Sequence, residues 1–138
     1  MSLKQDLEHI LKTALATDPS FRRIEQVVMD GCIDDARRHA LEGSKEAFLV
    51  SVMRLMALPG NGHTRLIPND AISVLPLRFV SFRTTVQLTV AAPDITASRG
   101  ELIAVNGTPV SQFEIAADKF LAGTRQRKRV IWPILLVW

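Results

Sequence analysis

Several features are scarce in this sequence, and each scarcity removes a class of function. Cysteine occurs once, as Cys32, so the chain can form neither an internal disulfide nor a zinc site built from several cysteines. Tyrosine is absent, which removes one common general acid. No apolar run reaches the ~18 residues of a membrane-spanning helix, so we expect no membrane span. No signal peptide is visible at the N-terminus, and the compartment stays unassigned.

Charge of either sign is also modest. The 138 residues include 17 Lys and Arg against 14 Asp and Glu, a formal net charge of +3. Four of the five residues from Arg125 to Arg129 are basic, and this run accounts for most of the surplus. A nucleic-acid binder spreads basic charge over a face and interleaves aromatic residues. We therefore expect no nucleic-acid partner and interpret the run as a solvated helix end or turn.

What the sequence does contain, over its first sixty residues, is the periodicity of a small helical bundle. Apolar residues recur at spacings of three and four over residues 3–16, 21–41 and 44–58, which predicts three helices. Gly31 is a candidate break within the second helix. The expected caps are Ser2, Gly43 and Ser44. The residues expected to face the core in the second and third helices are Phe21, Ile24, Val27, Val28, Cys32, Ala36, Ala40, Phe48, Val52, Leu55 and Met56.

The composition changes after the turn signal at residues 59–62, where β-branched residues and short alternations take over. Asn106-Gly107 is a strong tight-turn pair. A helix is expected from Ser111 to Leu121, with a capping box between Ser111 and Glu114. The strand candidates are residues 64–67, 75–82, 85–90 and 101–105. Helices first and strands afterwards predict the α+β class.

Two short motifs carry a resemblance to a known family. Gly62-His63-Thr64 follows a helix and a glycine-rich turn, and residues 100–110, Gly-Glu-Leu-Ile-Ala-Val-Asn-Gly-Thr-Pro-Val, resemble the strand, turn and helix start of a PDZ domain. Their order resembles the tail-specific protease family, including its Tricorn-core-like members. The resemblance implies a helical bundle over residues 1–60 and a PDZ-like β module with one helix over 61–124. Residues 125–138 would begin a truncated catalytic domain or form a linker.

The same resemblance implies a function. The chain would be the N-terminal, substrate-handling part of a serine peptidase that hydrolyses peptide bonds, with a peptide or protein as its partner. In the Tricorn-like branch His63 would be the general base, although Gly62 stands where Tricorn has a serine. In the serine-lysine branch the base is a lysine and His63 has no assigned role. The nucleophile would lie beyond Trp138, so the chain alone is expected to be inactive. A bacterial periplasmic or secreted protein is compatible with the family.

Other interpretations stay open. His63 can equally be a turn residue whose imidazole satisfies backbone groups. Leu75, Leu77 and Phe79 lie in the segment that resembles a PDZ carboxylate-binding loop, without its usual glycine, and are the candidate substrate-binding residues. The alternative function is a non-catalytic PDZ-like module or scaffold that binds peptide tails by strand addition. The three histidines are too far apart to predict a metal site, and no cofactor is expected.

The C-terminal residues 131–138 form the most apolar run of the chain. Such a run needs a covering surface, which suggests a chain cut within its architecture. We expect this segment to be disordered or docked on another molecule, most simply as a homo-oligomer.

Overall fold

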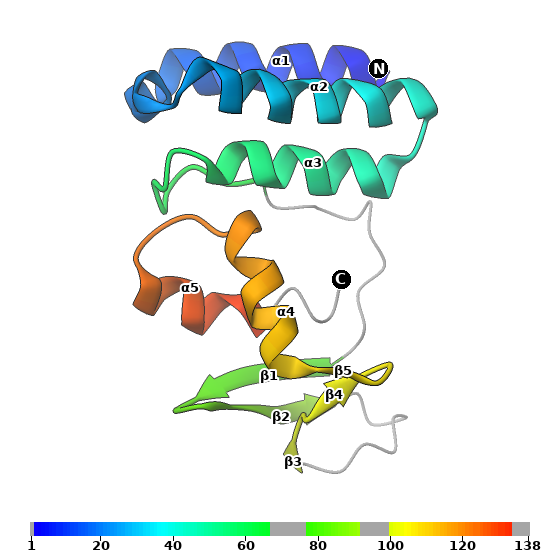
Figure 1. Cartoon of the computed structure of the whole chain (residues 1–138), viewed down its shortest axis with the longest axis vertical. Coiled ribbons are helices and arrows are strands. Elements are labelled where there is room, and N and C mark those ends of the chain that lie inside the picture. Colours follow the sequence, from blue (N-terminus) through cyan, green and yellow to red (C-terminus); the bar gives the residue numbers. More distant parts are fainter. Residues whose placement is uncertain (1, 67–76, 92–99, 134–138) are drawn as a thin grey trace. The chain divides into compact units, whose positions relative to one another are not determined.

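The computed structural model describes residues 2–66, 77–91 and 100–133, and it has an α+β fold (Figure 1), as predicted. Helices come first along the chain, and small antiparallel sheets follow. The opening helices are α1 (Leu3–Thr17), the short 3₁₀ helix η1 (Pro19–Arg23), α2 (Gln26–Glu42) and α3 (Lys45–Ala57). The chain divides into two compact units. The first comprises Met1–Asn69 with Lys119–Gly123, and the second comprises Asp70–Asp118 with Thr124–Trp138.

The predicted caps of the first unit are confirmed. Ser2 accepts a hydrogen bond from the backbone of Gln5, whose side chain accepts one from Ser2 in return, so α1 opens with a capping box. Gly43 ends α2 in the left-handed conformation with φ 72°. Ser44 opens α3 by accepting from the backbone of Ala47.

The expected second helix is wrong in one respect, because it is broken near its start. The break falls at the extended residue Ile24, between η1 and α2, while Gly31 lies inside α2. Two valines expected in the core are exposed as a result: Val27 is 75% exposed and Val28 is also exposed. Both lie in the first turn of α2, where Val27 faces away from the stripe of core residues and Val28 lies at its end.

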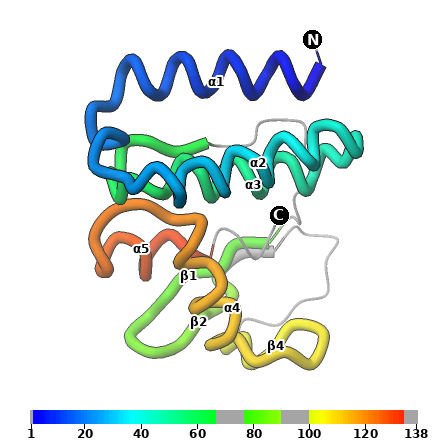
Figure 2. Tube along the Cα trace, turned by 45° about the horizontal axis from the view of Figure 1, so that its top comes forward, coloured from blue at the N-terminus to red at the C-terminus, as the bar shows by residue number. Residues whose placement is uncertain are grey.

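The core of the first unit lies between the three long helices, which run alongside one another (Figure 2). All four residues predicted to face inward from α3 are buried. The core cluster consists of Leu7, Ala14, Phe21, Cys32, Ile33, Ala36, Phe48, Val52, Leu55 and Met56. Burial of this apolar surface from several helices provides most of the stability of such a bundle.

The second unit holds two small antiparallel sheets. One has the order β1–β2–β3, with β1 (Leu77–Phe82), β2 (Thr85–Ala91) and β3 (Gly100–Glu101). The other pairs β4 (Ala104–Val105) with β5 (Thr108–Pro109) through the predicted Asn106-Gly107 turn, whose two residues have φ of 50° and 79°. Both φ values are positive, as the favoured two-residue hairpin turn requires.

Two strand expectations are corrected. Residues 64–66 form no strand; they follow the turn at residues 62–63, which the Thr64 N–H closes by donating to the Asn61 carbonyl (3.0 Å). Residue 67 lies outside the described residues. The expected strand 101–105 is divided into β3 and β4. Between them the Leu102 N–H donates to the Val86 carbonyl (2.8 Å), which links this stretch to β2.

The helices that follow the sheets are α4 (Val110–Ala117), η2 (Asp118–Phe120) and α5 (Arg125–Ile131), so this part of the chain has more than the one expected helix. The predicted Ser111 capping box is wrong, because the N-cap of α4 is Pro109, two residues earlier. The Val110 N–H already donates to the Ile103 carbonyl (2.9 Å), so the hairpin leads directly into the helix.

The basic run forms the short helix α5. Its N-cap is Thr124, whose hydroxyl accepts from the backbone N–H of Arg127 (3.3 Å). Trp132 and Pro133, at the start of the apolar C-terminal run, are buried within the chain itself. The expectation that this run needs another molecule therefore does not hold for these two side chains, and residues 134–138 lie outside the described residues.

Candidate functional site

The most constrained polar group of the described chain is the carboxylate of Asp18. Asp18 ends α1 and serves as the N-cap of η1, where its Oδ1 accepts from the backbone N–H of Ser20 (2.8 Å). Only 6% of its surface is exposed, and no other charged residue of the described ranges is buried. A buried charge must be met by hydrogen bonds or opposite charge, so the other carboxylate oxygen also needs donors.

Those donors come from the turn after α3. Asp18 Oδ2 accepts from the side-chain amide of Asn61 (3.1 Å) and from the hydroxyl of Thr64. Asn61 in turn holds the backbone of the turn, since its Oδ1 accepts from the N–H of His63 (3.1 Å). One carboxylate thereby fixes the end of α1 and the whole Asn61–Thr64 turn.

This hydrogen bonding also sets the ionisation of Asp18. The bonds from Ser20, followed by that from Thr64, lower the pKa of the carboxyl from 3.8 to about 2, with a smaller contribution from Asn61. Partial desolvation acts in the opposite direction and is outweighed. Asp18 is therefore ionised at neutral pH, and its charge is part of what holds the turn.

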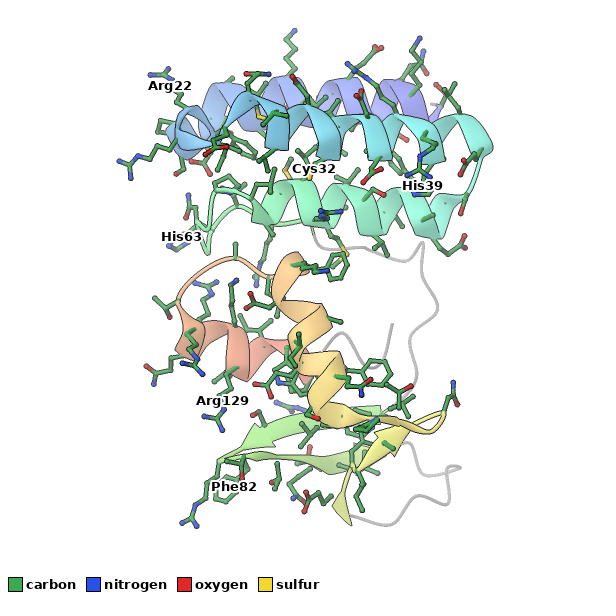
Figure 3. All side chains as sticks on the ribbon, in the orientation of Figure 1. Arg22, Cys32, His39, His63, Phe82 and Arg129 are labelled. Atoms are coloured by element: carbon green, nitrogen blue, oxygen red, sulfur yellow. The ribbon has the colours of Figure 1, made fainter. Side chains whose placement is uncertain are left out.

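His63 sits on this anchored turn. Figure 3 shows its side chain on the loop that follows α3, directed away from the helices, and the residue is exposed. Its backbone is held by Asn61, while its imidazole has no hydrogen-bond or ion-pair partner within the described ranges. The backbone of His63 is thus held in place while its imidazole stays accessible to a group that exchanges a proton with it.

Three other side chains that could take part in nucleophilic or acid–base chemistry, those of Ser51, Cys32 and His39, lie in ordinary structural roles. The hydroxyl of Ser51 donates to the carbonyl of Ala47 (2.8 Å) one turn earlier in α3. Cys32 is buried between α2 and α3, and this burial raises the pKa of its thiol, which opposes formation of a reactive thiolate. His39 Nδ1 lies 3.0 Å from a carboxylate oxygen of Glu42. The structure does not place any of these beside His63.

Only two of the three candidate substrate-binding residues lie in the part of the chain that the structure describes. Leu75 lies outside them. Leu77 and Phe79 lie on β1, both half-buried on the same face of the strand, and are paired with Ala91 and Leu88 of β2. The register of this pairing shifts between Arg78 and Phe79. The structure thus brings two of the three residues onto one face.

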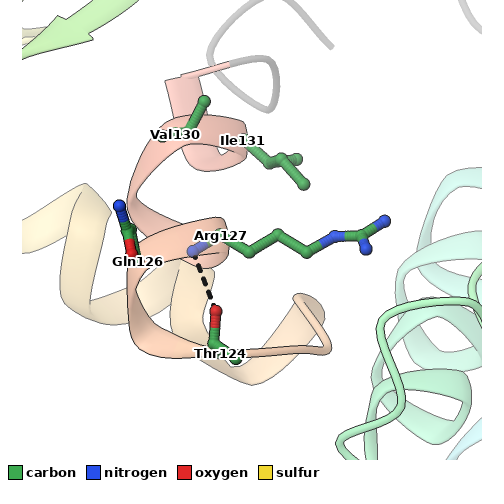
Figure 4. Close-up of a pocket in the computed structure, with 5 residues that line it drawn as sticks. All are labelled: Thr124, Gln126, Arg127, Val130 and Ile131. Atoms are coloured by element: carbon green, nitrogen blue, oxygen red, sulfur yellow. Dashed lines mark hydrogen bonds between the residues drawn. The ribbon is translucent and has the colours of Figure 1, made fainter.

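An open groove of about 520 Å³ lies along α5 (Figure 4). Its lining residues mix polar and apolar side chains, namely Thr124, Gln126, Arg127, Val130 and Ile131. Such a lining provides one positive charge and two β-branched apolar surfaces.

The described residues contain no group of three or more His, Cys, Asp or Glu side chains that could hold a metal ion. None of their helices is both long enough and apolar enough to cross a bilayer. Comparison with known proteins finds no matching family, no matching curated protein and no matching solved structure. The assignment of function therefore depends on the residues themselves.

The sequence singled out His63 within Gly62-His63-Thr64, but it did not indicate the hydrogen bonds that join Asp18 to Asn61 and Thr64. A local signal for Asp18 did exist, because Asp18-Pro19-Ser20 has an acidic N-cap followed by proline at the first helical position. The pairing with Asn61 had no such signal, since the two residues are 43 positions apart.

Proposed function

We propose that this chain is the N-terminal, substrate-handling part of a serine peptidase of the tail-specific, Tricorn-core-like type, with His63 as its general base. The observation that carries the proposal is the Asp18–Asn61–Thr64 network, which holds the backbone of the Gly62-His63-Thr64 motif and leaves the imidazole accessible. A general base needs this combination, because it must be fixed in position yet reachable by the group whose proton it takes.

The chemistry assigned to His63 is proton transfer. The imidazole would take the proton of a serine hydroxyl as the oxygen attacks a peptide carbonyl, and would return it to the leaving amine as the acyl-serine forms. The proposal places that serine outside the 138 residues. The hydrogen bonds of Asp18 are to Ser20, Asn61 and Thr64 and not to the imidazole, so its proposed role is to position the backbone.

The test compares two substitutions of His63 in the longest polypeptide that contains this chain. His63→Ala and His63→Gln should each lower kcat by ~10²–10⁴-fold, the usual scale for a positioned general base. His9→Ala is the matched control, because His9 is also exposed but lies on α1; it should leave kcat unchanged. The 138-residue chain by itself should release no product from any peptide.

An unchanged kcat in both His63 variants would remove the histidine from the mechanism and place the protein in the serine-lysine branch. Turnover by the 138-residue chain that disappears on substitution of one of its own serines would overturn the placement of the nucleophile. These two results are independent of each other.

A second candidate function is supported by one observation in the sheet. Among the described strands, β1 is paired on one side only, with β2. A non-catalytic module could bind an extended peptide by adding it to this edge through main-chain hydrogen bonds. A peptide found to bind should lose its affinity when its backbone nitrogens are methylated, whereas binding through side chains alone would survive that change.

A further inference from the structure

One surface of the second unit combines exposed arginines with exposed apolar side chains. We call it the hairpin–helix patch, and it consists of Phe82, Arg83, Arg125, Arg129 and Val130. Phe82 ends β1 and Arg83 begins its turn into β2, while the other three residues lie on the exposed side of α5. The guanidinium of Arg129 donates to the backbone carbonyl of Arg83, which joins the helix to the hairpin turn.

The charge of this region is of one sign. The segments 77–91 and 124–133 contain six basic residues and no acidic residue. Of the six, Lys128 is neutralised by Asp118, with Nζ and Oδ1 3.1 Å apart. The arginines of the patch have no carboxylate partner in the part of the chain that the structure describes. A concentrated positive charge of this kind attracts an anionic partner.

The apolar members of the patch are largely exposed. Phe82 is 60% exposed and Val130 is 66% exposed. The guanidinium of Arg83 lies over the Phe82 ring, 5.5 Å from its centroid. Phe82 therefore stands at the hairpin turn with an arginine stacked on it, which places an apolar tip and a positive charge side by side.

We propose that the hairpin–helix patch binds the surface of an anionic lipid bilayer. Arginines beside a membrane are attracted to anionic headgroups, and an adjoining aromatic and aliphatic side chain can enter the boundary between headgroups and acyl chains. The groove along α5 shares Val130 with the patch, and its Arg127 can meet a headgroup phosphate there. A single-stranded nucleic acid fits less well, because such sites stack successive bases on several aromatic side chains and the patch offers one.

The test measures co-sedimentation of the whole 138-residue chain with lipid vesicles. Vesicles containing roughly one-third phosphatidylserine should bind it, while phosphatidylcholine alone should bind it weakly, and high salt should release it. The double variant Arg83→Gln/Arg125→Gln keeps the Arg129 bond and should weaken binding about 25-fold, at roughly fivefold per arginine. Phe82→Ser should also weaken binding while leaving the charge unchanged.

The matched control is Arg22→Gln/Arg23→Gln, which removes the same charge from two exposed arginines of η1 in the first unit. This pair should bind the anionic vesicles within about twofold of the unchanged chain, because it lies outside the patch. If the double patch variant fails to fold, Phe82→Ser and the control pair still test the proposal.

Three results would overturn it. Equal binding to neutral and anionic vesicles would show that the arginines do not recognise anionic headgroups. Equal losses in the control pair and the patch pair would indicate a general charge effect. Absence of vesicle binding, together with an oligonucleotide or an acidic peptide that is released by the patch substitutions, would assign the patch to that partner instead.

Discussion

The carboxylate of Asp18 accepts a hydrogen bond from the side-chain amide of Asn61 (3.1 Å), which follows it by 43 positions in the chain. The bond connects the end of the first helix to the turn after α3. Because Asn61 also accepts from the backbone of His63, the position of that backbone depends on an acidic residue far from it in sequence. The helical bundle and the histidine turn are therefore one structural unit.

Replacement of Asp18 should loosen this turn. Asp18→Asn replaces one of the two accepting oxygens by an NH₂ donor, which must then face either the Ser20 N–H or the donors of Asn61 and Thr64, and Asp18→Ala leaves all three without this acceptor. We expect the melting temperature to fall by several degrees in both variants and the amide resonance of His63 to move. Asp34→Asn on α2 is the control, because its ion pair with Arg37 is exposed and should contribute little. An unmoved His63 resonance in Asp18→Ala would contradict the anchoring role.

The same carboxylate should make stability depend on pH in acid. Hydrogen bonding lowers the pKa of Asp18 to about 2 in the folded state, below its ordinary value of 3.8. Its contribution is therefore fully present above the ordinary pKa and is lost as pH falls through the folded value. Denaturant unfolding between about pH 5 and pH 2 should show a free energy that declines more steeply in the unchanged chain than in Asp18→Ala. Equal slopes in the two proteins would show that other carboxylates dominate.

Two apolar side chains of the bundle should differ sharply in their importance. Leu55 is fully buried within the core cluster, so Leu55→Ala should lower the free energy of unfolding by about 2–5 kcal/mol through lost burial and a residual cavity. Val27, which the sequence suggested for the core, is exposed, and Val27→Ala should change the free energy by less than about 0.5 kcal/mol. Denaturant titration of the two variants measures both values, and similar losses would indicate that Val27 is covered in solution.

The homo-oligomer expected from the apolar C-terminal segment stays a prediction. Burying each large apolar side chain contributes ~1.5–3 kcal/mol, which favours association when such side chains are exposed. Light scattering should give the mass of a dimer for the full chain and of a monomer for a chain that ends at Gly123. A monomeric mass for the full chain would contradict the predicted homo-oligomer.

Much of the fold could be predicted because its signals are local. Ser2, Gly43 and Ser44 cap helices through groups within three residues of themselves, and Asn106-Gly107 forms its turn from the φ preferences of two residues. The expected Ser111 cap is wrong, because α4 already begins at Val110, whose N–H donates to the Ile103 carbonyl seven residues earlier in the chain.

The candidate site was predictable in part for the same reason. His63 stood out through its neighbours in sequence, while the residues that hold it act across the bundle. The sequence around Asp18 predicts that one of its carboxylate oxygens caps a helix. It does not predict that the other oxygen accepts hydrogen bonds from Asn61 and Thr64. Such a pairing is decided by how the helices pack, which a single sequence does not state.

The division of the chain into two units has a consequence for its synthesis. The first unit includes Lys119–Gly123, and the Gly123 N–H donates to the Gly60 carbonyl (2.9 Å). A chain emerging from the ribosome can form its three long helices early, but it cannot make this bond until the Asp70–Asp118 segment of the second unit has been translated. At ~5–20 residues per second, the nascent first unit would remain incomplete for several seconds while the strands emerge. Nascent chains arrested before residue 119 should therefore be cleaved by protease near Gly60 more readily than the released protein.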